Sequence, residues 1–304
     1  MALAAGSHFD VAVLGGGYAG LSAALQLARA RRAVAVVDAG ERRNRMARHA
    51  HGFLGRDGDS PGDIAREGRE QLLAYPGVQW VEGRATAAER SDNGFVVDTN
   101  QGRVSAARLV LALGVVDELP ALDGVDERWG RRVFHCPYCH GHELARRPDA
   151  EPAIGVLAAG DTAVHQALLL TDWGRVTLLP CAGWQPDADQ QALLKTRDVA
   201  VESVPADRLL RESTVELADG RRLDFAGLFT QTRTRVASPI PEALGCEMSA
   251  CPTGVHIHVD AAQATSVPGV WACGDVARAS GSVALAVGEG ALAGIAAHQS
   301  LVLG

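Results

Sequence analysis

The chain has 304 residues, of which 47% are hydrophobic and 21% are charged, a composition typical of roughly two packed domains and not of a disordered chain. The formal net charge of −7 argues against a basic face for nucleic acid or for an anionic membrane surface. No apolar run approaches the roughly 20 residues that cross a membrane, and the first ten residues, MALAAGSHFD, lack the basic segment of a secretory signal. We therefore expect a cytoplasmic protein that binds neither nucleic acid nor membrane.

The first 38 residues have the order of a βαβ unit. Residues 9–14 (FDVAVL) predict a strand, the glycine-rich turn Gly15–Gly20 follows, and residues 21–30 have helical spacing. A β-branched run over 33–37 predicts the second strand, which ends at Asp38. This order is typical of a doubly wound sheet.

The glycines in this turn fit the pattern G-x-G-x-x-G at Gly15, Gly17 and Gly20. They permit a tight turn, a close approach of the backbone to a pyrophosphate, and close packing of helix on strand. The phosphates would meet the helix N-terminus, and Asp38 is placed to accept hydrogen bonds from a ribose. The sequence therefore predicts a dinucleotide site here, and a purely structural glycine turn is the alternative.

A second unit of the same kind begins at Ile154, with the segments IGVLAAG, DTAVHQALLLTDWG and RVTLLP. It indicates an internal duplication with weaker glycines. Proline-containing segments at 115–122 and 238–244 are typical of crossings between domains. We predict an α/β fold of two Rossmann-like, doubly wound, three-layer domains: a discontinuous domain (1–117 and 245–304) with 118–244 inserted as the second.

The richest chemistry lies in Cys136-Pro137-Tyr138-Cys139-His140. A two-residue spacer on the first turn of a helix brings two sulfurs within disulfide reach, and the helix N-terminus favours the thiolate. Pro137 suits the first helical position. We predict a redox disulfide, with Cys136, Cys139 and His140 as catalytic residues and His140 as the proton carrier.

Other interpretations of this segment stay open. Its cysteines and three histidines (His135, His140 and His142) are zinc-type ligands, but no second C-x-x-C completes a structural site, so we predict no metal. C-x-x-C-H is also the attachment pattern of covalent haem, which normally accompanies export. His140 has the further alternative of being a helix-surface residue.

These features together resemble the low-molecular-weight thioredoxin reductase family. The resemblance rests on Gly15–Gly20, the LALG segment at Leu111–Gly114, the Cys pair in the inserted domain, and the closing Gly274-Asp275. It implies FAD as cofactor, a homodimer, Cys139 facing the flavin and Cys136 exchanging with substrate. The cofactor-binding residues expected beside the glycines and Asp38 are Tyr18, Ala19, Asn44, His51, Gly114, Gly274, Asp275 and Val283.

Departures from the family pattern point to a subgroup. The CPYCHGHE and Arg43–Gly58 segments resemble dithiol oxidases that close disulfides in natural products such as holomycin and gliotoxin. The second nucleotide motif has Ala158 where a reductase has its first glycine, and residues 179–184 offer no cation to the 2′-phosphate of NADPH.

We therefore predict a FAD-dependent oxidase of a small-molecule dithiol, with O2 as the electron acceptor. One alternative is a disulfide reductase that receives electrons from NADPH or ferredoxin. The other is a non-catalytic flavoprotein that sequesters a thiol compound.

Overall fold

The computed structural model describes residues 8–145 and 151–304. Part of the N-terminal segment considered for a secretory signal, residues 1–7, lies outside the described residues. The chain forms two compact units. Unit 1 comprises Met1–Arg45, Gly52–Val116 and Thr234–Gly304, and unit 2 comprises Met46–His51 and Asp117–Arg233. The units divide at 116/117 and 233/234, while the sequence-based boundaries are 117/118 and 244/245.

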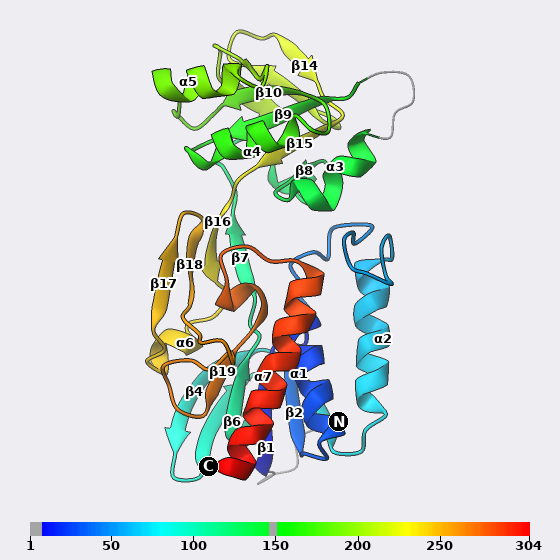
Figure 1. Cartoon of the computed structure of the whole chain (residues 1–304), viewed down its shortest axis with the longest axis vertical. Helices are drawn as coiled ribbons and strands as arrows, with labels where there is room; N and C mark the ends of the chain where they lie inside the picture. The colour runs from blue at the N-terminus through cyan, green and yellow to red at the C-terminus, as the bar shows by residue number, and fades with distance from the viewer. Residues whose placement is uncertain (1–7, 146–150) are drawn as a thin grey trace. The chain divides into compact units, whose positions relative to one another are not determined.

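Unit 1 is built on a parallel sheet whose strands run in the order β3-β2-β1-β6-β19 (Figure 1). In that order the strands are Val78–Glu82, Val34–Asp38, His8–Leu14, Gly102–Leu111 and Val270–Ala272. The first half of β6 also pairs with an antiparallel hairpin, β4 (Ala85–Ser91) and β5 (Gly94–Thr99).

One face of this sheet is covered by helices α1 (Tyr18–Arg29), α2 (Pro61–Leu73) and α7 (Val283–Leu303). Ser60 caps α2 by accepting the Asp63 N–H, and Pro61 takes the first helical position. Helix α7 packs along α1 (Figure 1). The contact requires glycine, because a Cβ on Gly290 or Gly294 would lie 2.1 or 2.4 Å from backbone carbonyl oxygens of α1.

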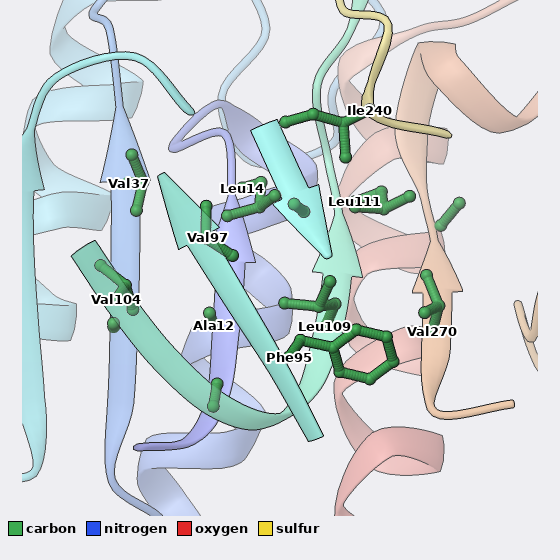
Figure 2. Packing of buried hydrophobic residues seen from close by; sticks show 14 of the residues in the cluster. Ala12, Leu14, Val37, Phe95, Val97, Val104, Leu109, Leu111, Ile240 and Val270 are labelled. Carbon is green, nitrogen blue, oxygen red and sulfur yellow. The ribbon is translucent and has the colours of Figure 1, made fainter. Parts of the chain in front are cut away.

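The opposite face carries the larger apolar cluster of unit 1 (Figure 2). Alternate residues of the parallel strands, such as Ala12 and Leu14 of β1, point toward Phe95 and Val97 of the β4–β5 hairpin. Ile240 from the short helix α6 (Ile240–Ala243) closes the cluster. Unit 1 therefore has three layers, with β-structure in place of a second helical layer.

Unit 2 repeats this plan on a parallel sheet with the order β11-β10-β9-β15-β8. These strands are Ala200–Val201, Arg175–Pro180, Ala153–Ala158, Gly227–Thr230 and Val133–Phe134. Helices α3 (Pro137–Ala145), α4 (Thr162–Leu170) and α5 (Ala188–Lys195) belong to this unit, and α4 and α5 pack on one face. The other face packs on the antiparallel strands β12 (Ala206–Leu209), β13 (Thr214–Leu217) and β14 (Arg222–Asp224).

The remaining elements are short. They are β7 (Val115–Glu118), β16 (Arg233–Val236), β17 (Met248–Cys251), β18 (Gly254–Ile257) and the 3-10 turns η1 (Asp126–Arg128) and η2 (Gly274–Ala277). The unit boundaries fall within β7 and at the start of β16. The predicted α/β class with two Rossmann-like domains is confirmed. Among the described helices, none has both the length and the apolar character needed to cross a membrane.

Candidate functional site

Most of the predicted cofactor residues gather at one edge of unit 1. They follow the carboxyl ends of β1, β2, β6 and β19, or lie at the N-terminus of α1 or α7. This edge is where open α/β sheets bind their ligands. The set is Gly15, Gly17, Tyr18, Ala19, Gly20, Asp38, Asn44, Gly114, Gly274, Asp275 and Val283, all in unit 1.

The glycine turn has the geometry that a pyrophosphate needs. Gly15 has φ +106°, and a Cβ there would lie 2.1 Å from the Ala112 carbonyl oxygen. Gly17 is the N-cap of α1, carries no side-chain cap and has open space where a Cβ would be. A Cβ on Gly20 would lie 1.8 Å from the Gly15 oxygen, so α1 sits directly on the turn. The first N–H groups of α1 therefore face space in which a phosphate fits.

Polar groups flank this turn. Asp38 Oδ1 accepts the Gly16 N–H at 3.0 Å, and within the described residues Oδ2 has no hydrogen-bond partner. The Tyr18 hydroxyl lies 3.3 Å from Asn44 Oδ1 and donates to the Pro61 carbonyl at 3.0 Å. Burial raises the pKa of Tyr18. The open carboxylate oxygen is available for a ribose hydroxyl, and the residues present fit a dinucleotide.

A second group of residues follows β19. Gly274 has φ +77°, and its N–H donates to Glu289 Oε2 at 3.0 Å. Arg43 Nη1 lies 3.0 Å from Asp275 Oδ2, with both side chains about one-fifth exposed. Val283 is the first residue of α7, whose N-cap Ser282 accepts the Leu285 N–H. The positive end of α7 and a partly buried carboxylate thus lie close in sequence, as the resemblance implies for flavin and ribityl contacts.

Glu289 is a residue that the sequence analysis missed. It binds Gly274 and also forms an ion pair with Arg278, and burial raises its pKa. It is the only carboxylate in the apolar helix α7. A lone acid in such a helix is the signal that would have identified it.

His51 differs from the other predicted cofactor residues because it belongs to unit 2. Its Nε2 lies 3.5 Å from Glu143 Oε1 of α3, and its ring centroid is 6.2 Å from that of His49. Within unit 2 it therefore lies near the helix that carries the Cys pair.

Cys136 and Cys139 form a disulfide at the start of α3, with Cα atoms 5.3 Å apart. Pro137 is the first residue of the helix, as the sequence predicts. The Cys139 N–H lies 3.2 Å from Cys136 Sγ, so the helix N-terminus supports negative charge on this sulfur. The preceding loop is held by Gln166, which is fully buried and donates to the His135 carbonyl at 2.7 Å.

His140 follows the pair and is partly buried. Its ring stacks on Phe134 with centroids 4.0 Å apart, and Nδ1 is buried without a hydrogen-bond partner in the described structure. Burial lowers the pKa of His140 to about 4, against the opposing effect of the Glu143 charge. The imidazole is therefore neutral at pH 7, when it can accept a proton.

The other cysteines do not pair. Cys181, Cys246 and Cys273 are buried free thiols, and Cys251 is a partly exposed one. Burial raises the pKa of Cys181 to about 11. Within residues 8–145 and 151–304, no group of three or more His, Cys, Asp or Glu is arranged to hold a metal ion.

The second nucleotide motif, in unit 2, has other contacts than the turn of unit 1. Ala158 is the last residue of β9 and is fully buried. Asp161, the N-cap of α4, accepts hydrogen bonds at Oδ1 from Trp184 Nε1 at 2.9 Å and Gln190 Nε2 at 3.1 Å. Trp184 follows β10, in the segment where the sequence lacks a cation for NADPH.

Comparison with known proteins gives the family. The pyridine nucleotide-disulphide oxidoreductase model matches residues 9–290. Thioredoxin reductase sirT of Leptosphaeria maculans is 31% identical, over 95% of this chain and 93% of that protein.

Two solved structures are similar over nearly the whole chain. An oxidoreductase from Agrobacterium tumefaciens has a TM-score of 0.92 and 52% identity, over 98% of this chain and 99% of that one. HlmI has a TM-score of 0.89 and 36% identity, over 99% of this chain and 95% of that one. With the dinucleotide turn in unit 1 and the disulfide in unit 2, the chain belongs to the pyridine nucleotide-disulphide oxidoreductase family, as a thioredoxin reductase-like enzyme that carries FAD.

Proposed function

We propose that the protein is a FAD-dependent dithiol oxidase that forms a disulfide in a small molecule through Cys136 and Cys139. The observation that carries this proposal is the contact of Trp184 and Gln190 with Asp161 at the N-terminus of α4. A nicotinamide dinucleotide would need this edge of unit 2 for its pyrophosphate and ribose. Here an indole and an amide hold the Asp161 carboxylate at this edge, and the buried Ala158 stands where a reductase has its first glycine, which supports the proposal.

The thiol chemistry proceeds by exchange. A substrate thiolate attacks Cys136 Sγ, the bond to Cys139 breaks, and a mixed disulfide forms between Cys136 and the substrate. The second substrate thiol attacks the substrate sulfur of this bond, which releases the substrate disulfide and the Cys136 thiolate. Two electrons and two protons have then passed to the Cys pair. FAD, which the glycine turn Gly15–Gly20 and Asp38 would hold, would supply the acceptor for these two electrons, with O2 as the final oxidant and H2O2 as its product.

His140 serves this exchange as a base. In this role the imidazole takes a proton from the incoming thiol and returns it to the leaving Cys139 sulfur. Burial lowers its pKa and so weakens it as a base before the substrate binds. The stacked Phe134 ring holds the imidazole in place. The assignment of Cys136 as the exchange thiol and Cys139 as the flavin-facing thiol follows the family resemblance.

The competing function is a reductase that runs in the other direction, and it is favoured by the name thioredoxin reductase that sirT carries. Anaerobic titration of the flavin separates the two. A dithiol should bleach the flavin and NADPH should not, with O2 restoring the oxidised spectrum. Rapid bleaching by NADPH would overturn the oxidase. Binding of a thiol compound without any turnover would instead support sequestration.

We further propose a homodimer formed through α7. Leu285, Leu292, Ile295 and Val302 are exposed, and their spacing places them on one side of the helix, away from the residues that face α1. Leu292→Glu with Ile295→Glu should give a monomer by light scattering. Leu73→Glu, at an exposed leucine of α2, is the control and should leave the mass unchanged.

We also propose a cytoplasmic location, because the four free thiols suit a reducing compartment.

A further inference from the structure

Unit 2 contains a cavity of about 770 Å³ whose lining reaches His140, the residue that directly follows Cys139. All of its lining residues belong to this unit, and they include His140 and the Phe134 ring on which it stacks. A volume of this size suits a small molecule and not a protein segment. A substrate whose thiols reach Cys136 would place the rest of its structure here.

The lining of this cavity is rich in cations. Four arginines and three glutamates contribute to it: Arg48, Arg128, Arg131, Arg132, Glu127, Glu143 and Glu212. The glutamates are engaged, because Glu127 pairs with Arg128 at 3.0 Å, Glu212 with Arg132, and Glu143 with His51 at 3.5 Å. Among the described residues, Arg48 and Arg131 have no carboxylate partner. In a protein with a net charge of −7, the four arginines thus exceed the three glutamates of this lining by one positive charge.

Arg128 adds a donor without an acceptor. Its Nη1 donates to the Gly124 carbonyl at 2.8 Å, whereas its Nε is buried and has no hydrogen-bond partner in the described structure. Arg128 also lines a neighbouring cavity of about 710 Å³ together with Arg211, Arg222 and Asp224.

The backbone that carries these arginines is fixed. Arg128 ends η1, and its carbonyl accepts the N–H groups of Arg131 at 3.0 Å and Arg132 at 2.9 Å. The Arg132 carbonyl in turn accepts the Leu228 N–H of β15 at 2.9 Å. Arg131 is therefore attached to the parallel sheet of unit 2 and not to a free loop, which reduces the entropy lost when an anion binds to it.

We propose that this cavity selects dithiols that carry a carboxylate, which Arg131 and Arg48 bind while the thiols exchange with Cys136. A guanidinium presents a planar pair of donors that matches a carboxylate, and this pairing is stronger than one between neutral groups. The inference rests on the proposed dithiol oxidase and names its class of substrate. It makes the two arginines the residues that set specificity.

The test compares dihydrolipoate with dihydrolipoamide, two dithiols that differ in whether a carboxylate or a neutral amide ends the same chain. The rate of anaerobic flavin bleaching by each gives a ratio of kcat/KM values. We expect dihydrolipoate to be favoured by about tenfold at low salt. The ratio should fall toward one in the Arg48→Gln/Arg131→Gln double variant and be partly kept in Arg131→Lys. Arg175→Gln, at an exposed arginine outside the cavity lining, is the control and should keep the ratio.

Ionic strength tests the same point without any variant. Raising salt from about 20 mM to about 300 mM should reduce the wild-type preference, because exposed charges are screened. A ratio near one at low salt, or a ratio that the double variant leaves unchanged, would overturn the carboxylate site.

A failure of the proposed oxidase activity would give a different result from a failure of the carboxylate site. Neither dithiol would then bleach the flavin, yet calorimetry with the oxidised forms, lipoate and lipoamide, would still report binding to the holoenzyme. If the wild type binds lipoate more tightly than lipoamide and the Arg48→Gln/Arg131→Gln variant does not, the carboxylate site would be supported without the oxidase activity. Equal binding of the two would overturn it.

Discussion

Each unit contains a strand–turn–helix segment, β1 to α1 in unit 1 and β9 to α4 in unit 2, and the turns of these two segments differ. In unit 1 the chain leaves β1 through Gly15 at φ +106°, and the N-cap of α1 faces open space. In unit 2 the strand continues through Ala158, no residue between 158 and 163 has a positive φ, and Asp161 is bound by Trp184 and Gln190. Both units nevertheless have the same three layers, which are helices, a parallel sheet and antiparallel strands. The two turns therefore differ in backbone conformation and in the polar contacts at the start of the following helix.

The largest effect is expected at the disulfide of unit 2. Cys136→Ser removes the sulfur that substrate attacks, so turnover of a dithiol should fall by about a thousandfold or more. Cys181→Ala is the matched control, because burial raises the pKa of that thiol to about 11 and keeps it protonated. Oxygen consumption measures both. Turnover that persists in Cys136→Ser would remove the pair from the mechanism.

The next effect separates the two turns directly. Gly15→Ala should reduce the FAD content to below about a tenth of the wild type, since alanine resists the left-handed backbone and its methyl would meet the Ala112 oxygen. Gly160→Ala, at the corresponding turn of unit 2, has open space and should keep full FAD. The flavin-to-protein absorbance ratio measures the content, and far-UV circular dichroism checks folding. Equal FAD loss in both variants would contradict the assignment of the cofactor to unit 1.

The third effect concerns the pH dependence of stability that His140 gives to unit 2. Its pKa is depressed in the folded state, so the unfolded chain binds the proton more readily between about pH 6.5 and pH 4. Stability should therefore fall as the pH drops through this range, by up to about 3 kcal/mol. His140→Gln should flatten the dependence and His142→Gln, at an exposed position of α3, should not. Urea unfolding at several pH values checks this, and identical slopes for all three proteins would refute it.

The smallest effect should come from reopening the turn of unit 2. Ala158→Gly with Trp184→Ala restores a flexible position and removes the indole from Asp161, so weak NADPH binding should appear, with a dissociation constant of about a millimolar. Calorimetry on the wild type and the double variant measures the change. Tight NADPH binding by the wild type would show that the two turns are functionally alike.

Much of the fold could be predicted because local patterns specify it. The strand, glycine turn, helix and Asp38 follow each other in the first 38 residues, and Pro137 marks the start of α3. Hydrophobic periodicity and glycine spacing are local, so the sequence displays them directly. The β-structured third layer of unit 1 was not predicted, because covering the sheet with β4 and β5 depends on packing against Phe95 and not on any single segment.

The site was harder to predict where contacts join distant residues. Arg43 with Asp275, Glu289 with Gly274, and Trp184 with Asp161 link positions that only the fold brings together. The low pKa of His140 likewise comes from burial against Phe134, whereas its residue type alone suggests a value near neutrality. The cationic cavity has no motif, since its arginines come from 46–51 and 117–233.

The close contact of α7 with α1 has a consequence for the order in which the protein is made. Unit 1 needs β19 and α7, which are synthesised after unit 2, whereas nearly all of unit 2 is a continuous stretch from Asp117 to Arg233. Domains fold as units during translation, so unit 2 can gain its core and its Cys pair while β1 and α1 still wait for Gly290 and Gly294 to emerge. Flavin uptake should then be the final event of biogenesis. A ribosome-bound chain stalled before residue 270 should already contain the disulfide-bearing unit and yet be colourless.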